Sequence, residues 1–156
     1  VWRRTRGALR RPALPAIGLV VLVVAIFIAR GARTWSAGVY PWQSSFLAGA
    51  AWARQHTAPD DVIGAFNAGI LGYFSWRETV NLDGVTDFAA QRALAAGQVA
   101  AYAGERRLSY IIDYSAYVEE MYSPFYGRDV GAWLKPAAVV SAPDWRYGAV
   151  TVYAVQ

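Results

Sequence analysis

A long apolar run near the start of the chain most restricts what this protein can fold into. Residues 13 to 29, with the sequence ALPAIGLVVLVVAIFIA, include no charged and no polar side chain. The charge-free stretch between Arg11 and Arg30 is eighteen residues long. As a helix it spans about 27 Å, roughly the hydrocarbon thickness of a bilayer. Eleven of its residues are Leu, Ile, Val or Phe, which favour insertion by roughly 3 to 7 kcal/mol. We predict a transmembrane helix over residues 12–30.

Two other interpretations of this run fit its pattern less well. A buried core helix would carry a polar stripe at a period of about 3.6 residues, and this run is apolar all round. A cleaved signal peptide would explain the arginine-rich start, with Ala29, Arg30 and Gly31 as a loose cleavage site. Its apolar core is usually about 7 to 15 residues long, however, and Arg30 and Arg33 follow the run directly. We therefore favour the spanning helix and keep the signal peptide as the alternative.

The arginines around the run predict its orientation. Five precede it and two follow it closely, so the amino-terminal side is expected in the cytoplasm and the rest outside. The aromatic residues near its ends fit interfacial belts: Trp2, Trp35, Tyr40 and Trp42. The predicted organisation in the cell membrane is a cytoplasmic basic flank at 1–11, the helix at 12–30, an interfacial linker at 31–43 and an extracytoplasmic α/β domain at 44–156.

The basic charge of the chain belongs to the membrane flank. The net charge is +4, with 15 Lys and Arg against 11 Asp and Glu. Residues 1–33 hold seven arginines and no acid, which leaves a net charge of −3 for residues 34–156. This acidic part offers no basic face for a nucleic acid. There is no cysteine and one histidine, His56, so we expect no metal and no cofactor.

Periodicity after residue 43 predicts a small three-layer mixed-sheet α/β domain. Helices are expected at 44–56 and 86–107, with a glycine-spaced helix or turn at 67–76. Parallel strands are expected at 62–66, 79–82 and 109–113, the last of these apolar at its centre as in a strand covered on both faces. The segment 137–155 contains two β runs around PDWRYG, which predicts a hairpin or a pair of edge strands that includes Asp144 in its turn.

The stretch SWRETVNLDGVTD, Ser75 to Asp87, concentrates charge around an Asp-Gly step. We interpret Asp83 and Gly84 as a tight turn, and Thr86 or Asp87 as the cap of the following helix. A ligand role is the alternative. Arg77, Asn81 and Asp83 at the carboxyl end of a strand could hold sugar hydroxyls or a phosphate. A hard cation held by Asp83 and Asp87 is a weaker possibility, because oxygen sites usually need more carboxylates.

A second candidate surface is YSAYVEEMYSPFYGRD, residues 114–129, where tyrosines lie beside Glu119, Glu120 and Arg128. Aromatic faces flanked by polar groups suit sugar rings. Tyr117, Tyr122 and Arg128 are the ligand-binding candidates there. The favoured alternative is that the rings form a core edge, or contact the membrane or another part of the protein.

The segment from Ala50 to Asp87 resembles bacterial polyprenol-dependent glycosyltransferases of the GT-C class, which are related to protein mannosyltransferases and aminoarabinose transferases. The resemblance rests on four pieces in order: Trp52 in a helix, Pro59 to Gly64, Gly69 to Ser75, and Asn81 to Gly84. It covers about forty residues. The chain departs from the family pattern after the glycine, where it has Val85, Thr86 and Asp87.

This resemblance implies sugar transfer from a polyprenyl-phosphate donor to an extracytoplasmic acceptor. It also implies that the catalytic acid lies in an outward loop that this chain does not include, so no catalytic residue is assigned here. The chain would be the last membrane span and a non-catalytic C-terminal domain. Its implied partners are the lipid bilayer, a polyprenyl-phosphate sugar or glycan, and the remaining transmembrane part. The alternative is a stand-alone membrane-anchored module that binds a ligand or has a structural role.

Overall fold

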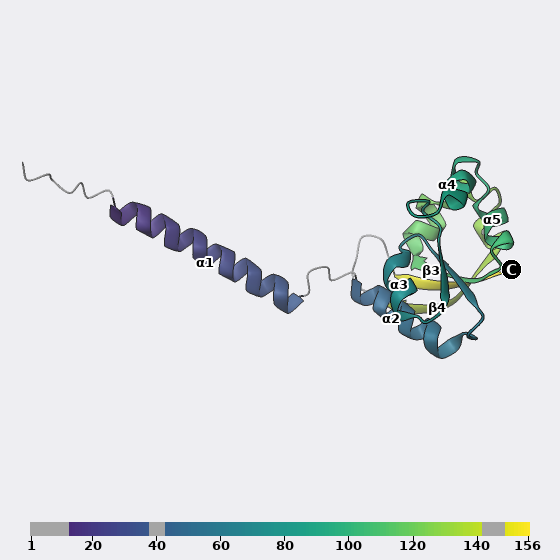
Figure 1. The fold of residues 1–156 in the computed structure, drawn as a ribbon, viewed down its shortest axis with the longest axis horizontal. Helices are drawn as coiled ribbons and strands as arrows, with labels where there is room; N and C mark the ends of the chain where they lie inside the picture. Colours follow the sequence, from purple (N-terminus) through teal and green to yellow (C-terminus); the bar gives the residue numbers. More distant parts are fainter. Residues whose placement is uncertain (1–12, 38–42, 142–148) are drawn as a thin grey trace, which may run out of the picture. The chain divides into compact units, whose positions relative to one another are not determined.

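The computed structural model describes residues 13–37, 43–141 and 149–156 (Figure 1). The chain divides into two units, Val1–Tyr40 and Pro41–Gln156. The first unit contains helix α1, Ala13–Ala37. The second contains a mixed sheet with helices. The predicted α/β class, with an apolar helix before it, is confirmed.

Helix α1 is long and apolar enough to cross a membrane. The stretch Pro15–Trp35 has a mean hydropathy of 2.3, and none of it is buried. The helix does not end near residue 30, where the linker was expected to begin, but continues to Ala37. The reason is local, since residues 31–37 contain no proline and only one glycine that could interrupt the helix. Of the expected aromatic belt, Trp35 is exposed, while Trp2, Tyr40 and Trp42 lie outside the described residues.

Five strands form the sheet of the second unit, in the order β2-β1-β3-β5-β4. They are β1 Val62–Ala65, β2 Glu78–Asn81, β3 Leu108–Tyr114, β4 Leu134–Ser141 and β5 Val150–Val155. Strand β1 pairs in parallel with both β2 and β3, so the three predicted parallel strands are confirmed. Strand β5 runs antiparallel between β3 and β4. The predicted turn between β4 and β5, with Asp144, lies outside the described residues.

Helices cover both faces of the sheet (Figure 1). Helices α2, Gln43–His56, and α3, Ala68–Phe74, pack through Phe46 and Leu71 against one face, which includes Ile112. Helices α4, Phe88–Ala95, and α5, Val99–Glu105, belong to the core on the other face, which includes Ile111. Ile111 and Ile112 are consecutive in β3 and point to opposite faces, which explains why the centre of that strand is apolar throughout.

The single helix predicted over residues 86–107 is wrong, because the chain forms α4 and α5 instead. Gly97 has φ +64, a left-handed conformation that glycine adopts at little cost. Its N–H donates to the Leu94 carbonyl at 3.0 Å, and the Gln98 N–H donates to the Ala93 carbonyl at 2.8 Å. This pair of bonds is the Schellman motif that ends helices. The alanine-rich pattern conceals the break, since only one glycine marks it.

Three short helical segments connect β3 to β4. They are Tyr117–Met121, Ser123–Phe125 and Val130–Ala132. The Val118 side chain and the Tyr126 ring are buried, and the Tyr126 hydroxyl donates to the Val118 carbonyl at 2.7 Å. This connection therefore belongs partly to the core, although it follows a strand on the side where α/β domains usually bind ligands.

Candidate functional site

The carboxyl ends of the three parallel strands meet at one edge of the sheet. The order β2-β1-β3 means that the chain leaves β1 toward β2 on one side and later returns to β3 on the other. Such a reversal leaves a crevice outside the strand ends, where open α/β sheets bind ligands. The segments that border this crevice are therefore those that follow Ala65, Asn81 and Tyr114.

A cleft of about 280 Å³ lies at this edge. Polar and apolar side chains both line it, since Gln43, Asn67, Asn81 and Asp83 face the same space as Phe46, Phe66 and Ile70, together with Ala68 and Gly69. Of the sequence candidates, the structure places Asn81 and Asp83 here. The cleft combines several hydrogen-bonding groups with apolar side chains, which is the usual lining of a small-molecule site, although Phe46 and Phe66 are buried core residues that form its floor.

A buried carboxylate fixes one wall of the cleft. Asp113 is fully buried near the end of β3. One of its oxygens accepts hydrogen bonds from the Phe66 and Asn67 backbone N–H groups, both at 2.8 Å. The other accepts from the Asn67 side-chain amide at 3.0 Å and from the Tyr114 N–H at 2.8 Å. These bonds hold the loop after β1 in place.

Burial raises the pKa of Asp113 to about 6, although the hydrogen bonds that it accepts act in the opposite direction. The sequence interpretation did not select this residue. An acid inside the otherwise apolar strand LSYIIDY is the signal that could have identified it, because a buried charge requires several polar partners.

The segment after β2 is a tight turn, as predicted. The Asn81 side-chain oxygen accepts from the Asp83 N–H at 3.1 Å, and the Asp83 carboxylate accepts from the Val85 N–H at 2.7 Å. Gly84 has φ +76, and a Cβ there would lie 2.7 Å from Gln91 Cα. Only glycine fits both requirements. Asn81 and Asp83 therefore shape the turn and line the cleft at the same time.

Asp87 caps α4. It is one of the two residues, Thr86 and Asp87, that the sequence predicted for this role. Its carboxylate accepts from the Ala89 and Ala90 N–H groups at 2.8 and 3.3 Å, and from the Tyr102 hydroxyl at 2.6 Å. The Tyr102 bond lowers the pKa of Asp87. Burial, followed by the bond to Asp87, raises the pKa of Tyr102 to about 12. With these three donors in place, Asp87 has a structural role, and it does not line the cleft.

Metal binding finds no support in the described residues. They contain no group of three or more His, Asp or Glu side chains that could hold an ion. His56 is exposed, its Nδ1 lies 2.9 Å from the Trp52 carbonyl oxygen, and its ring stacks on Trp52 at 5.0 Å. This geometry suits the end of a helix better than a ligand position.

Arg77 was expected beside Asn81 at the carboxyl end of the strand, and the structure places it at the other end. It precedes β2, and its guanidinium donates to the Arg54 carbonyl at 3.1 Å and the Thr57 carbonyl at 2.8 Å. It also donates to the Thr57 hydroxyl at 3.0 Å. These are acceptors at the carboxyl end of α2, where a cation is favoured. The strand predicted at 79–82 already separates Arg77 from the residues at its carboxyl end, so grouping Arg77 with Asn81 and Asp83 was wrong.

The tyrosine-rich segment adjoins the cleft through Phe66. The Tyr122 ring stacks on Phe66 with centroids 3.8 Å apart, and Tyr117 meets Tyr122 edge-on at 6.0 Å. Burial, and then the charge of Asp83, raises the pKa of Tyr122. Tyr117 and Tyr122 therefore lie behind the cleft wall. Arg128 is exposed and does not line the cleft.

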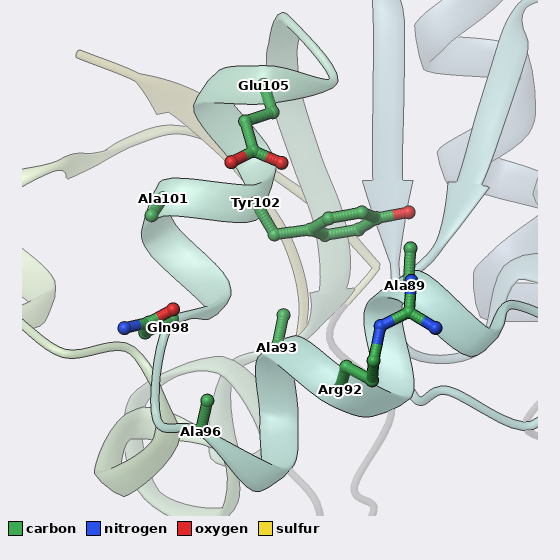
Figure 2. A pocket seen from close by; sticks show the side chains of 8 residues that line it. All are labelled: Ala89, Arg92, Ala93, Ala96, Gln98, Ala101, Tyr102 and Glu105. Atoms are coloured by element: carbon green, nitrogen blue, oxygen red, sulfur yellow. The ribbon is translucent and has the colours of Figure 1, made fainter.

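Two other hollows are less suited to a ligand. One of about 260 Å³ lies between α4 and α5, and half of its lining residues are alanines (Figure 2). Figure 2 shows the Tyr102 ring extending from α5 toward α4, where its hydroxyl already bonds to Asp87. The other, of about 560 Å³, lies at the amino ends of the strands around the ion pair of Arg106 with Glu78. Neither has more than one amide side chain in its lining, whereas the cleft has three.

Residues 34–153 match the family described as "Domain of unknown function (DUF8728)". The chain belongs to this family. The DUF8728 match begins within α1 and covers the sheet through most of β5. No curated protein and no solved structure matches the chain. For this DUF8728 member, the cleft and the apolar helix are the features that bear on function.

Proposed function

We propose that residues 43–156 form the non-catalytic extracytoplasmic domain of an integral-membrane glycosyltransferase that uses a polyprenyl-phosphate sugar donor, and that the cleft binds a sugar. The observation that carries the proposal is the lining of the cleft. Asn67, Asn81 and Asp83 offer amide and carboxylate groups to the cleft, and the half-buried Ile70 adds an apolar surface. Sugar rings present hydroxyls, which bond to such polar groups, and C–H faces, which pack on apolar side chains.

The size of the cleft favours a single sugar unit. Its volume of about 280 Å³ lies just below the range of about 300 to 1,000 Å³ that is typical of pockets for drug-sized ligands. An oligosaccharide would have to extend outside it. The Asp83 carboxylate is well suited to accept hydroxyl hydrogen bonds, because charged acceptors form shorter and stronger bonds than neutral ones.

The same lining argues for binding without catalysis. Glycosyl transfer needs a positioned base, or a pair of carboxylates at a defined separation. Asp83 is the single carboxylate among the described residues that line the cleft. The Asp113 carboxylate behind the wall already accepts four hydrogen bonds. On this proposal the catalytic acid is supplied by another part of the protein.

A stand-alone membrane-anchored binding module is the second candidate. The observation in its favour is that the described residues contain one candidate span, Pro15–Trp35. The coding sequence upstream of Val1 discriminates between the two. Several further spans with an acidic residue in the first outward loop would favour the transferase domain, and a start codon close to Val1 would favour the module.

Saturation-transfer NMR on the full chain in lipid nanodiscs tests sugar binding. The probes are methyl glycosides of mannose, glucose and galactose, and the corresponding hexose 1-phosphates. We expect transfer to at least one of them and its loss in Asp83→Asn, because an Asn oxygen can still accept from the Val85 N–H while the charge is removed. Asp60→Asn, an exposed change outside the cleft, is the matched control. No transfer to any probe, or equal transfer in both variants, would contradict the proposal.

A further inference from the structure

The turn between β2 and α4 exposes two large apolar side chains. We call residues 82–88 the rim loop. Val85 is 81% exposed and Phe88 is 78% exposed. Neither side chain belongs to the two core clusters of the domain. Single exposed apolar residues are ordinary, but two of them on one short turn beside a cleft form a candidate contact surface.

The rim loop holds these side chains outward with a fixed backbone. The Val85 N–H donates to the Asp83 carboxylate, and Asp87 caps the helix that begins at Phe88. Gly84 packs so closely on Gln91 that a Cβ would lie 2.7 Å from its Cα. A turn with this many internal bonds does not bury Val85 or Phe88 by a small rearrangement. Their exposure is therefore a property of the folded turn.

The first helix of the domain begins beside the rim loop. Gln43 lines the same cleft as Asp83 of the rim loop, and only residues 38–42 separate α1 from Gln43. The chain therefore enters the α/β domain at the edge of the sheet that exposes Val85 and Phe88.

We propose that the rim loop contacts the surface of the lipid bilayer, with Val85 and Phe88 in the headgroup region and the cleft open toward it. This rests on the membrane attachment in the proposed function and adds a surface that the sugar-binding argument does not use. The acidic side chains of the loop are Asp83 and Asp87. The contact is therefore apolar, and it should form on phosphatidylcholine and change little with salt, unlike binding to anionic lipid.

Spin labels on the full chain test this contact. The sequence contains no cysteine, so single labels can be attached in Val85→Cys and Phe88→Cys, in the control Asp60→Cys, and in Val23→Cys within α1. The chain is placed in phosphatidylcholine nanodiscs. Collision rates are measured with oxygen, which concentrates in the bilayer, and with a water-soluble nickel chelate. Val85 is exposed, so a label there disturbs no core packing.

We expect labels at 85 and 88 to collide several-fold more with oxygen, and less with nickel, than the label at 60. A water-exposed label at 85 together with a bilayer-embedded label at 23 would overturn this inference and leave the proposed function standing. A water-exposed label at 23 would overturn the membrane attachment as well. Shielding of 85 from both reagents would indicate contact with protein, and that also contradicts the inference.

Discussion

The Asp113 carboxylate and the Asn67 side-chain amide lie 3.0 Å apart, and this contact joins β3 to the loop that follows β1. Two backbone N–H groups of the same loop bond to the other oxygen of Asp113. Asn67 and Phe66 line the cleft, and Asp113 is fully buried behind them. The shape of the cleft therefore depends on a residue that a ligand would not touch.

Replacing Asp113 with asparagine should destabilise the domain strongly. Both oxygens of Asp113 accept hydrogen bonds from N–H groups. An asparagine has only one side-chain oxygen, so its NH₂ group would face N–H donors whichever way the amide is turned. We expect the free energy of unfolding to fall by roughly 2 to 4 kcal/mol. Urea denaturation of the full chain in detergent, followed by near-ultraviolet circular dichroism, measures this. Asp129→Asn, at an exposed position, should be nearly neutral. A similar small effect for both variants would contradict the role given to Asp113.

The pH dependence of stability should carry a signature of the same residue. Its pKa is raised from 3.8 to about 6 in the folded state, so the folded chain binds the proton more tightly than the unfolded chain. The contribution of Asp113 to stability is then greatest below pH 4 and is lost as pH rises through about 6. Over that interval the free energy of unfolding of the wild type should fall by roughly 3 kcal/mol. The Asp113→Asn variant should not show this fall, because it has no carboxyl group at this position. Parallel pH profiles for the two proteins would contradict this assignment.

Tyr102→Phe should weaken the cap of α4. The substitution removes the hydroxyl that donates to Asp87 at 2.6 Å. We expect the free energy of unfolding to fall by about 1 kcal/mol. The pKa of Asp87 is lowered in the folded state, so its stabilising contribution is present above its unfolded pKa and is lost as pH falls through the folded value. In the variant the Asp87 pKa should rise, which carboxyl carbon NMR detects. The control Tyr73→Phe, at an exposed tyrosine, should leave the pKa of Asp87 unchanged.

Arg77→Met should affect stability and leave sugar binding unchanged. The guanidinium bonds to acceptors of Arg54 and Thr57 at the end of α2, and losing these bonds should cost about 1 to 2 kcal/mol. Arg106→Met, which breaks an exposed ion pair with Glu78, should cost less than about 1 kcal/mol. If saturation transfer to the sugar disappears in a stable Arg77→Met protein, Arg77 has the ligand role that its position argues against.

The chain by itself should neither transfer a sugar nor hydrolyse a glycosidic bond, because the cleft lining contains one carboxylate among the described residues.

Asp83→Ala in the complete protein should lower the free energy of unfolding by about 0.5 to 2 kcal/mol through loss of the bond from the Val85 N–H. Turnover and thermal stability are measured together. Abolished turnover at unchanged stability would show that Asp83 acts in catalysis.

Local patterns in the sequence predicted most of the fold. The three parallel strands are short apolar runs bounded by turn residues, and the Asp83-Gly84 turn with the Asp87 cap follows from side-chain chemistry within a few residues. The break at Gly97 was missed because alanine is compatible with a helix on both sides of it. The partners of Arg77 and Asp113 were missed because they lie far away in the sequence, and only the packing of α2 and the strand order bring them together.

The two border strands of the sheet have a consequence for the membrane attachment proposed above. Strand β4 lies at the edge, contains Pro136, and shifts register twice against β5. Proline has no N–H to donate, and an irregular edge gives a neighbouring strand no continuous ladder to extend. At the other edge, β2 is only four residues long. On the proposed membrane attachment, copies of the chain would reach high local concentrations in two dimensions, and both borders of this sheet discourage neighbouring copies from joining edge to edge.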